Sequence, residues 1–233
     1  MNRYLQETQM LDYASPSIQE LARERGWSGL PEAERVRAIY DFVRDEILFG
    51  YNVDDAIPAS RVLADGFGQY NTKGTLFIAL LRRCGIPCRV HGFSIDKKLQ
   101  KGAMTGIVYR NAPQEIFHSW VEVLLDRRWY ELEGFILDKG YLESLQAAFP
   151  DCAGAFCGYG VAVKDFRHPP IDFEGNDTYI QSEGITRDLG TYDCPDDLLQ
   201  EHGQAMSPMK AFAYRHLGRH LMNRNVKRIR DRT

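Results

Sequence analysis

The chain has 233 residues, of which 44% are hydrophobic, 12% aromatic and 26% charged. This composition is that of a globular protein, and it excludes collagen-like, coiled-coil and intrinsically disordered chains. No stretch approaches the ~18 consecutive apolar residues of a membrane-spanning helix, and residues 1–13 lack the apolar core of a signal peptide. We therefore expect a cytoplasmic protein with one domain over 1–233.

The charges are distributed unevenly along the chain. The formal net charge is −3, but residues 210–233 hold eight Lys and Arg against one acid, which leaves 21 basic and 31 acidic residues in 1–209. A basic tail can bind nucleic acid, anionic lipid or an acidic surface of its own fold. We expect the tail to dock on an acidic surface of its own fold, because its apolar and histidine residues follow the spacing of one helix face. We therefore expect no nucleic-acid or membrane partner. The residues on this helix face are Met209, Phe212, His216, Leu217, His220 and Leu221.

Neither a disulfide framework nor a metal site is indicated. The five cysteines include no C-x-x-C pair, which favours a reduced compartment and argues against structural zinc. The acidic run at 172–177 lacks the spacing of an EF-hand, and His216 and His220 have no third ligand beside them. Glycine-rich phosphate-binding motifs are also missing from the sequence. We expect no metal and no cofactor, and oligomeric state is left open.

Helices are predicted in the first part of the chain. Ser15 followed by Pro16 signals a short helix that ends at Gly26. A second helix, over 31–47, has acids in its first turn and apolar residues at helical spacing. A third helix, over 70–84, is apolar on most sides, which is typical of a buried helix.

Strands follow the third helix. Three stretches rich in β-branched and aromatic residues are predicted as strands, the last two joined in a hairpin at Asp126 and Arg127. The segment 138–206 is less regular, with helices predicted over 141–149 and near Pro195. Helices followed by an antiparallel sheet indicate the α+β class. The predicted strands are 87–95, 117–125 and 129–137.

One set of residues points to chemistry. Gly68 and Gln69 precede the buried helix, His118 lies in a predicted strand, and Glu133 lies in the next strand. The first turn of a helix has unsatisfied N–H groups that stabilise negative charge. A hairpin that turns at 126–127 places Glu133 nearly opposite His118, where its carboxylate could orient the imidazole. A single histidine in a strand is more often structural than catalytic. These residues by themselves therefore leave both a structural and a catalytic role for His118 open.

Three blocks of sequence resemble the transglutaminase-like superfamily, which belongs to the papain-like cysteine enzymes. They match the opening of the family's central helix, the Gly-Ile-Pro-x-Arg exit from it, and a His-x-Trp-Val-Glu-Val strand with an acid after a tryptophan on the next strand. The resemblance covers about 35–137 and implies a buried central helix packed on an antiparallel sheet, with extra helices at both ends and a C-terminal extension over 138–233. The blocks are Gly68 to Leu76, Leu80 to Arg89, and His118 to Val123 with Trp129 to Glu133.

The resemblance implies a role for each site residue. His118 falls on the family's catalytic histidine, and Glu133 falls on its acid, where Asp is commoner. Gln69 precedes the nucleophile and would support an oxyanion together with the backbone N–H of Tyr70. Trp120 would pack as a supporting residue under the hairpin.

Tyr70 stands where the family has its nucleophilic cysteine. The cysteines nearest in sequence, Cys84 and Cys88, lie at the far end of the helix, about 20 Å away at 1.5 Å per residue. A phenol, with an ordinary pKa of about 10, cannot replace a thiolate in attacking an amide and then leaving from a thioester. We therefore expect no ordinary thiol chemistry.

Two interpretations of Tyr70 remain. In the first, an atypical Tyr70–His118–Glu133 triad acts on an amide or related carbonyl by acid/base or acyl-transfer chemistry. We favour this interpretation because a site without catalytic activity has no need for a paired histidine and acid. In the second, the protein is an inactive pseudoenzyme that binds a peptide, a protein partner or a small ligand. An introduced substitution at 70 is also open. An exposed phenol near His118 would favour chemistry, and a buried ring would favour the pseudoenzyme.

Overall fold

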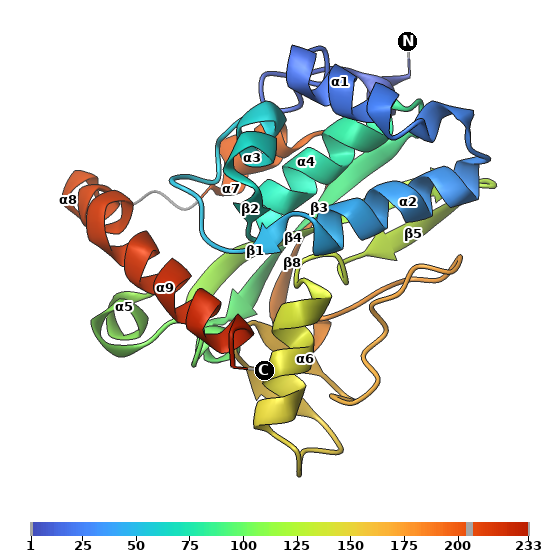
Figure 1. Ribbon diagram of the computed structural model, residues 1–233. Helices are drawn as coiled ribbons and strands as arrows, with labels where there is room; N and C mark the ends of the chain where they lie inside the picture. The colour runs from blue at the N-terminus through green and yellow to red at the C-terminus, as the bar shows by residue number, and fades with distance from the viewer. Residues whose placement is uncertain (1, 204–206, 233) are drawn as a thin grey trace.

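The helix α4 (Tyr70–Arg83) lies at the centre of the molecule and packs against a four-stranded antiparallel sheet (Figure 1). The computed structural model describes residues 2–203 and 207–232. Helices cover the central helix on its other side and decorate both ends of the chain. The α+β class and the buried central helix predicted from the sequence are confirmed.

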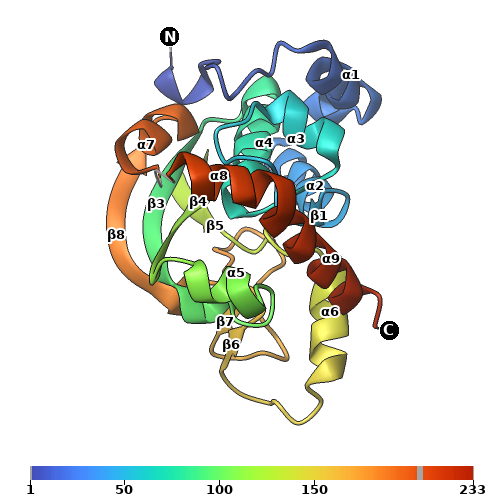
Figure 2. The same ribbon diagram turned by 90° about the vertical axis from the view of Figure 1, so that its left-hand side faces the viewer.

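The sheet has the strand order β5-β4-β3-β8, and Figure 2 shows β8 at its outer edge. The predicted hairpin between β4 and β5 is confirmed, since both residues at its tip, Asp126 and Arg127, have positive φ values of 48° and 65°, as a type I′ turn requires. The fourth strand, β8, lies in the segment where the sequence pattern was unclear. The strands are β3 (Cys88–Asp96), β4 (Glu115–Leu125), β5 (Arg128–Leu132) and β8 (Ile185–Tyr192).

The prediction that the last strand of the hairpin continues to residue 137 is wrong, because β5 ends at Leu132. The backbone N–H of Glu133 donates to the carbonyl of Thr178 at 2.9 Å instead of pairing with β4. The next residue, Gly134, lies so close to Tyr40 that a Cβ atom there would be 2.5 Å from the phenol oxygen. At this tight crossing, where Gly134 passes close to Tyr40 and Ile171, the chain leaves the sheet directly after β5.

The remaining elements surround this core. The predicted helices near 16–26, 31–47, 70–84, 141–149 and 195 are all present, with ends that differ by one or two residues in most cases, which is usual for helix boundaries. The helices are α1 (Pro16–Glu24), α2 (Glu32–Asp45), α3 (Ala59–Asp65), α5 (Gly106–Asn111), α6 (Lys139–Ala148), α7 (Pro195–His202), α8 (Pro208–Ala213) and α9 (Arg219–Arg230), and the short strand pairs are β1 (Leu48–Phe49) with β2 (Phe67–Gly68) and β6 (Phe156–Gly158) with β7 (Val161–Val163).

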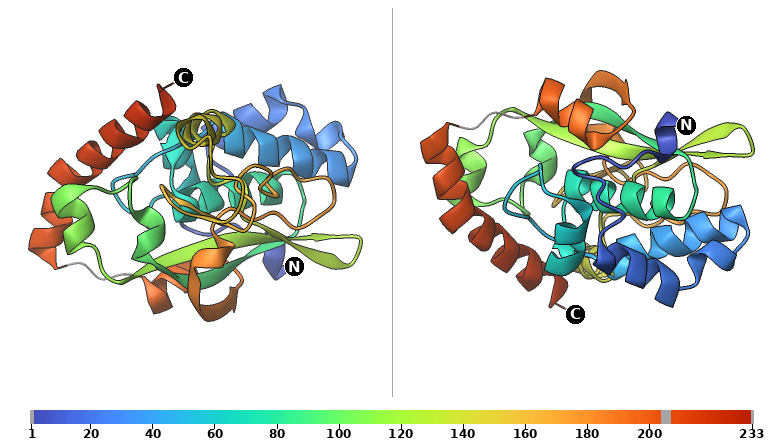
Figure 3. Two further views of the ribbon diagram at one scale, coloured as in Figure 1. Left: turned by 90° about the horizontal axis from the view of Figure 1, so that it is seen from below. Right: turned by 90° about the horizontal axis from the view of Figure 1, so that it is seen from above.

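Helices α8 and α9 are joined by a π turn over Tyr214–Gly218 and form a C-terminal arm, residues 208–230, along one edge of the molecule (Figures 1 and 3). The arm docks on the body as predicted, since Met222, Val226 and Ile229 are buried. Arg230 of the arm also forms an ion pair with Asp138 at 2.6 Å.

The prediction of which helix face docks is wrong, because most residues of the predicted face point to solvent. Met209 is 81% exposed, Phe212 is 64% exposed and Leu217 is 60% exposed. The buried Met222, Val226 and Ile229 continue the spacing of the half-buried Tyr214 and Gly218, so the docking face lies on the other side of the helix from the predicted residues.

Candidate functional site

Tyr70 is the first residue of α4 and follows the short strand β2. Its ring is buried, with 6% of the residue exposed, and it lies edge-on against the imidazole of His118 with 4.9 Å between ring centroids. Over the ranges that the structure describes, no hydrogen bond joins the phenol to this imidazole. The two rings are therefore in van der Waals contact only.

His118 and Glu133 form a closed pair. The Nε2 atom of His118 lies 2.7 Å from Oε1 of Glu133, and both side chains are fully buried. The other carboxylate oxygen accepts the backbone N–H groups of Ile180 and Gln181, each at 2.8 Å. Because a carboxylate only accepts, Nε2 carries the proton of this hydrogen bond. The Nδ1 atom of His118 has no partner within the described part of the chain.

Glu133 is placed by a segment distant in sequence. The strand β5 pairs with β4 so that Leu132 is opposite Val121, and continuing that register would place residue 135, not Glu133, opposite His118. Thr178 holds Glu133 at the required position, since its carbonyl and its hydroxyl both accept the backbone N–H of Glu133, at 2.9 and 3.2 Å. The predicted proximity of His118 and Glu133 is observed, but it depends on this second segment.

Electrostatics keep the Tyr70 phenol protonated. Burial raises the pKa of Tyr70 well above 10, and the nearby carboxyl of Asp55 and phenol of Tyr214 raise it further. The pKa of Asp55 is itself raised by burial, against the opposing effect of its hydrogen bonds from Gln69 and Asn71. Desolvation of the phenol therefore outweighs the stabilisation of negative charge that the N–H groups of the helix N-terminus provide.

The sequence did not indicate that Asp55 and Tyr214 lie near Tyr70. Asp55 lies in the loop before α3, and Tyr214 lies in the π turn of the C-terminal arm, where its hydroxyl donates to the carbonyl of Asn52 at 3.0 Å. Both approach the start of α4 from segments that are remote in sequence. The arm therefore contributes to the enclosure of Tyr70.

The side chain of Gln69 is engaged in positioning a loop. Its Oε1 accepts the N–H of Asn52 at 3.0 Å, and its Nε2 donates to Asp55 at 2.6 Å. These bonds use the amide oxygen and one of the two N–H donors of the amide group to which the sequence analysis assigned oxyanion support. The proposed role of Gln69 stays a prediction.

Trp120 lies two residues after His118 on β4 and packs in a cluster of aromatic rings. Its nearest ring is that of Phe93, with centroids 4.1 Å apart, followed by His91 at 5.4 Å and Tyr179 at 5.8 Å. The imidazole of His91 bridges two carboxylates, at 2.7 Å to Glu122 and 2.9 Å to Asp188. This cluster packs the sheet beside the candidate site.

A buried lysine lies one turn further along α4. Lys73 is fully buried, and its ammonium donates to the backbone carbonyls of Arg44 and Ile136 at 3.1 and 3.0 Å. Burial lowers its pKa to about 7. Because the Ile136 carbonyl belongs to the segment that follows Glu133, this lysine ties that segment to the central helix.

Comparison of the sequence with protein families matches the transglutaminase-like superfamily over residues 19–134. Residues 19–134 form a transglutaminase-like domain. The match includes Tyr70, His118 and Glu133, the residues that the structure brings together. No curated protein gives a match to this sequence.

Two solved structures are similar to this chain at low sequence identity. A candidate cysteine protease from Cytophaga hutchinsonii is 15% identical with a TM-score of 0.47, and the alignment covers 83% of this chain and 47% of that one. Red sea bream transglutaminase is 17% identical with a TM-score of 0.33, over 50% of this chain and 26% of that one. The chain thus spans about half of the first protein and about a quarter of the second.

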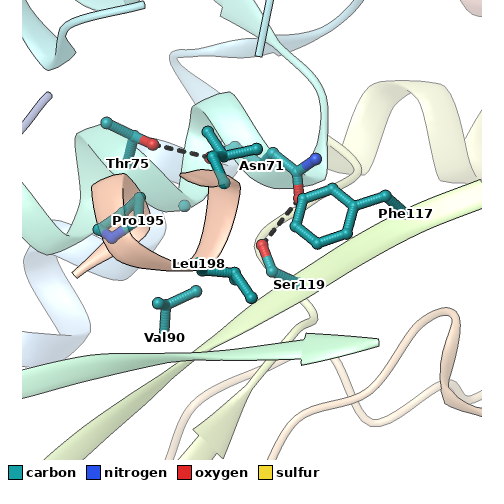
Figure 4. A pocket seen from close by; sticks show the side chains of 9 residues that line it. Asn71, Thr75, Val90, Phe117, Ser119, Pro195 and Leu198 are labelled. Atoms are coloured by element: carbon teal, nitrogen blue, oxygen red, sulfur yellow. Dashed lines mark hydrogen bonds between the residues drawn. The ribbon is translucent and has the colours of Figure 1, made fainter. Parts of the chain in front are cut away.

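A small hollow between α4, the sheet and α7 lies close to the candidate site, but neither Tyr70 nor His118 lines it. This hollow, of about 10 Å³, lies beside Asn71, and α7 covers it with Pro195 and Leu198 (Figure 4). Ser119 donates to the side chain of Asn71 at 2.8 Å across this hollow. A space of this size holds at most one water molecule.

The described residues contain no helix that is long and apolar enough to cross a membrane.

Proposed function

We propose that this transglutaminase-like domain is catalytically inactive toward amides and serves to bind a peptide or protein partner. The observation that carries the proposal is the position of Tyr70, whose buried ring covers the His118 imidazole without a hydrogen bond to it. An acid or base must reach the proton that it transfers and must have a pKa near the working pH. The Tyr70 phenol meets neither condition, since burial raises its pKa well above 10.

The burial of the Tyr70 ring against His118, and the small size of the neighbouring hollow, support binding at the surface around the site. Small-molecule sites are usually pockets of about 300–1,000 Å³, whereas the hollow beside Asn71 measures about 10 Å³. Pro195 from α7 closes this hollow, and Tyr214 from the arm lies near the phenol. A partner would therefore contact the rim formed by these segments, and a larger ligand such as a peptide suits a rim better than a small molecule does.

The intact His118–Glu133 pair is explained by stability in this proposal. Removing Glu133 would leave the imidazole Nε2–H and two backbone N–H groups buried without acceptors. Each buried unsatisfied donor costs about 1–3 kcal/mol. The pair can therefore persist for structural reasons in a domain without catalysis.

The test is to compare the wild type with Tyr70→Cys, Tyr70→Phe and His118→Ala. Amide, ester and glutamine-plus-amine substrates are offered to each, and each is also treated with iodoacetamide. We expect no turnover by the wild type or by Tyr70→Phe. Tyr70→Cys restores a thiol beside the free Nδ1 of His118, so we expect its alkylation at residue 70, located by peptide mapping, to slow when His118→Ala is added.

One result would overturn the proposal in favour of the Tyr70–His118–Glu133 enzyme. It is turnover by the wild type that disappears in both Tyr70→Phe and His118→Ala, while both variants keep the wild-type circular dichroism.

Peptide mapping of the alkylated protein is needed because Cys157 is exposed and reacts in every variant.

A further inference from the structure

Most of the strongly exposed large apolar side chains of the described residues gather in one place. There are six such side chains, and all but Leu48 lie on α5 or on the C-terminal arm. A pocket of about 360 Å³ lies between these two elements, which Figure 2 shows next to each other. Apolar side chains that collect on one surface mark an interaction site. The apolar stripe consists of Ile107, Met209, Phe212, Leu217 and Leu221, which are 44–81% exposed.

Unpaired cations accompany the apolar stripe. Lys210, Arg224, Lys227 and Arg228 are exposed, and within residues 2–203 and 207–232 none of them has a carboxylate within 4 Å. Arg224 and Arg228 line the same pocket as Leu221 and Ile107. These cations differ from Arg230 on the inner side of the arm, which is paired with Asp138.

We propose that the apolar stripe and these cations form a docking surface for a membrane that contains anionic phospholipids. An amphipathic helix with basic and apolar side chains lies in the membrane interface, with its apolar residues among the acyl chains and its cations at the phosphates. The proposal goes beyond the binding function proposed above and does not depend on it. It also departs from the expectation that the tail serves only to dock on its own fold.

The charge of the whole chain favours this partner over others. Residues 1–209 hold ten more acids than bases, whereas 210–233 hold eight bases and one acid, so an anionic membrane attracts only this end of the molecule. A second copy of the same face would place like charges against each other. Nucleic acid would use the cations but would leave Phe212 and Leu217 without an apolar contact.

The geometry indicates how the arm would enter the interface. The buried side of the arm, with Met222, Val226 and Ile229, stays on the body. On the opposite side Phe212 and Leu217 are exposed, and the Phe212 ring contacts the His216 ring at a tilt of 42°, with centroids 4.3 Å apart. The arm can therefore insert these side chains without undocking.

The experiment is vesicle co-sedimentation of the full chain. Vesicles of phosphatidylcholine mixed with phosphatidylserine are compared with vesicles of phosphatidylcholine alone, at low and high salt. We expect binding to the anionic vesicles that weakens with salt. Arg224→Glu with Arg228→Glu should weaken it at least about thirtyfold, since each lost basic residue near an anionic surface contributes about fivefold and each new carboxylate is repelled by that surface. Phe212→Ser with Leu217→Ser should also weaken it.

The matched control is Arg23→Glu with Arg127→Glu, which makes the same change of net charge on α1 and at the β4–β5 turn. Both are remote from the arm in Figure 1. We expect the control to bind within about twofold of the wild type.

Three results would overturn the proposal. The folded wild type could fail to bind anionic vesicles, or the control could lose as much binding as the arm variant. Sedimentation velocity without vesicles could instead show a dimer that Phe212→Ser with Leu217→Ser dissociates, which would assign the face to a second copy.

Discussion

Lys73 lies one helical turn after Tyr70 on α4, and burial moves the pKa of both side chains toward the uncharged form. The pKa of Lys73 falls to about 7, and that of Tyr70 rises well above 10. The first turn of the central helix is thus a region where charge is disfavoured. This property opposes the formation of a phenolate beside His118, and it gives two tests by titration.

Lys73 should make stability depend on pH. Its folded pKa of about 7 lies below the unfolded value near 10.5. Between these values the unfolded state binds more protons, so stability rises with pH. We expect the free energy of unfolding of the wild type, relative to Lys73→Met, to increase between about pH 7 and pH 9.5, by at most about 1.4 kcal/mol per pH unit. Urea unfolding of both proteins measures it. A difference that is constant with pH would show that Lys73 titrates normally.

Tyr70 should stay protonated where a free tyrosine ionises. We expect the ultraviolet difference spectrum of the wild type minus Tyr70→Phe to show no phenolate between about pH 9 and pH 11, because burial raises the pKa of this phenol. In Tyr214→Ala, which removes a neighbour that encloses Tyr70, the pKa should fall toward 10. A phenolate of Tyr70 that forms below about pH 9 and is lost in His118→Ala would contradict this and favour the catalytic interpretation.

Glu133 should be necessary for stability. Glu133→Ala removes the acceptor of His118 Nε2 and of two backbone N–H groups, all of them buried. We expect a loss of about 2–5 kcal/mol in the free energy of unfolding. The control is Glu143→Ala on the exposed side of α6, which should change stability by no more than about 0.5 kcal/mol. Equal effects at the two positions would show that the Glu133 network is not formed.

Gly134 should be intolerant of any side chain. A Cβ atom there would lie 2.5 Å from the phenol oxygen of Tyr40 and 2.8 Å from the backbone of Ile171. Since a backbone atom cannot move aside cheaply, we expect Gly134→Ala to cost about 1–3 kcal/mol. At Gly29 a Cβ meets nothing within 4 Å, so Gly29→Ala serves as the control in the same thermal melts. A Gly134→Ala protein that melts with the control would refute the tight crossing.

The sequence by itself determined the elements whose signals are local. The apolar stretch of α4 predicts a buried helix, and the turn residues Asp126 and Arg127 predict a hairpin. The register of this hairpin leaves Glu133 two residues from the position opposite His118. The motifs around them indicated the superfamily. These features follow from periodicity and turn chemistry, which act within a few residues of the chain.

Only the tertiary structure decided the features that depend on remote segments. Thr178 holds Glu133 outside the strand, and Asp55 and Tyr214 enclose Tyr70. The exposed fraction and the pKa of Tyr70 depend on these neighbours because desolvation is set by everything packed around a group. The contacts with the body likewise decided which face of the last helix docks, since apolar residues lie on both of its faces and, among its described residues, only Met222, Val226 and Ile229 are buried.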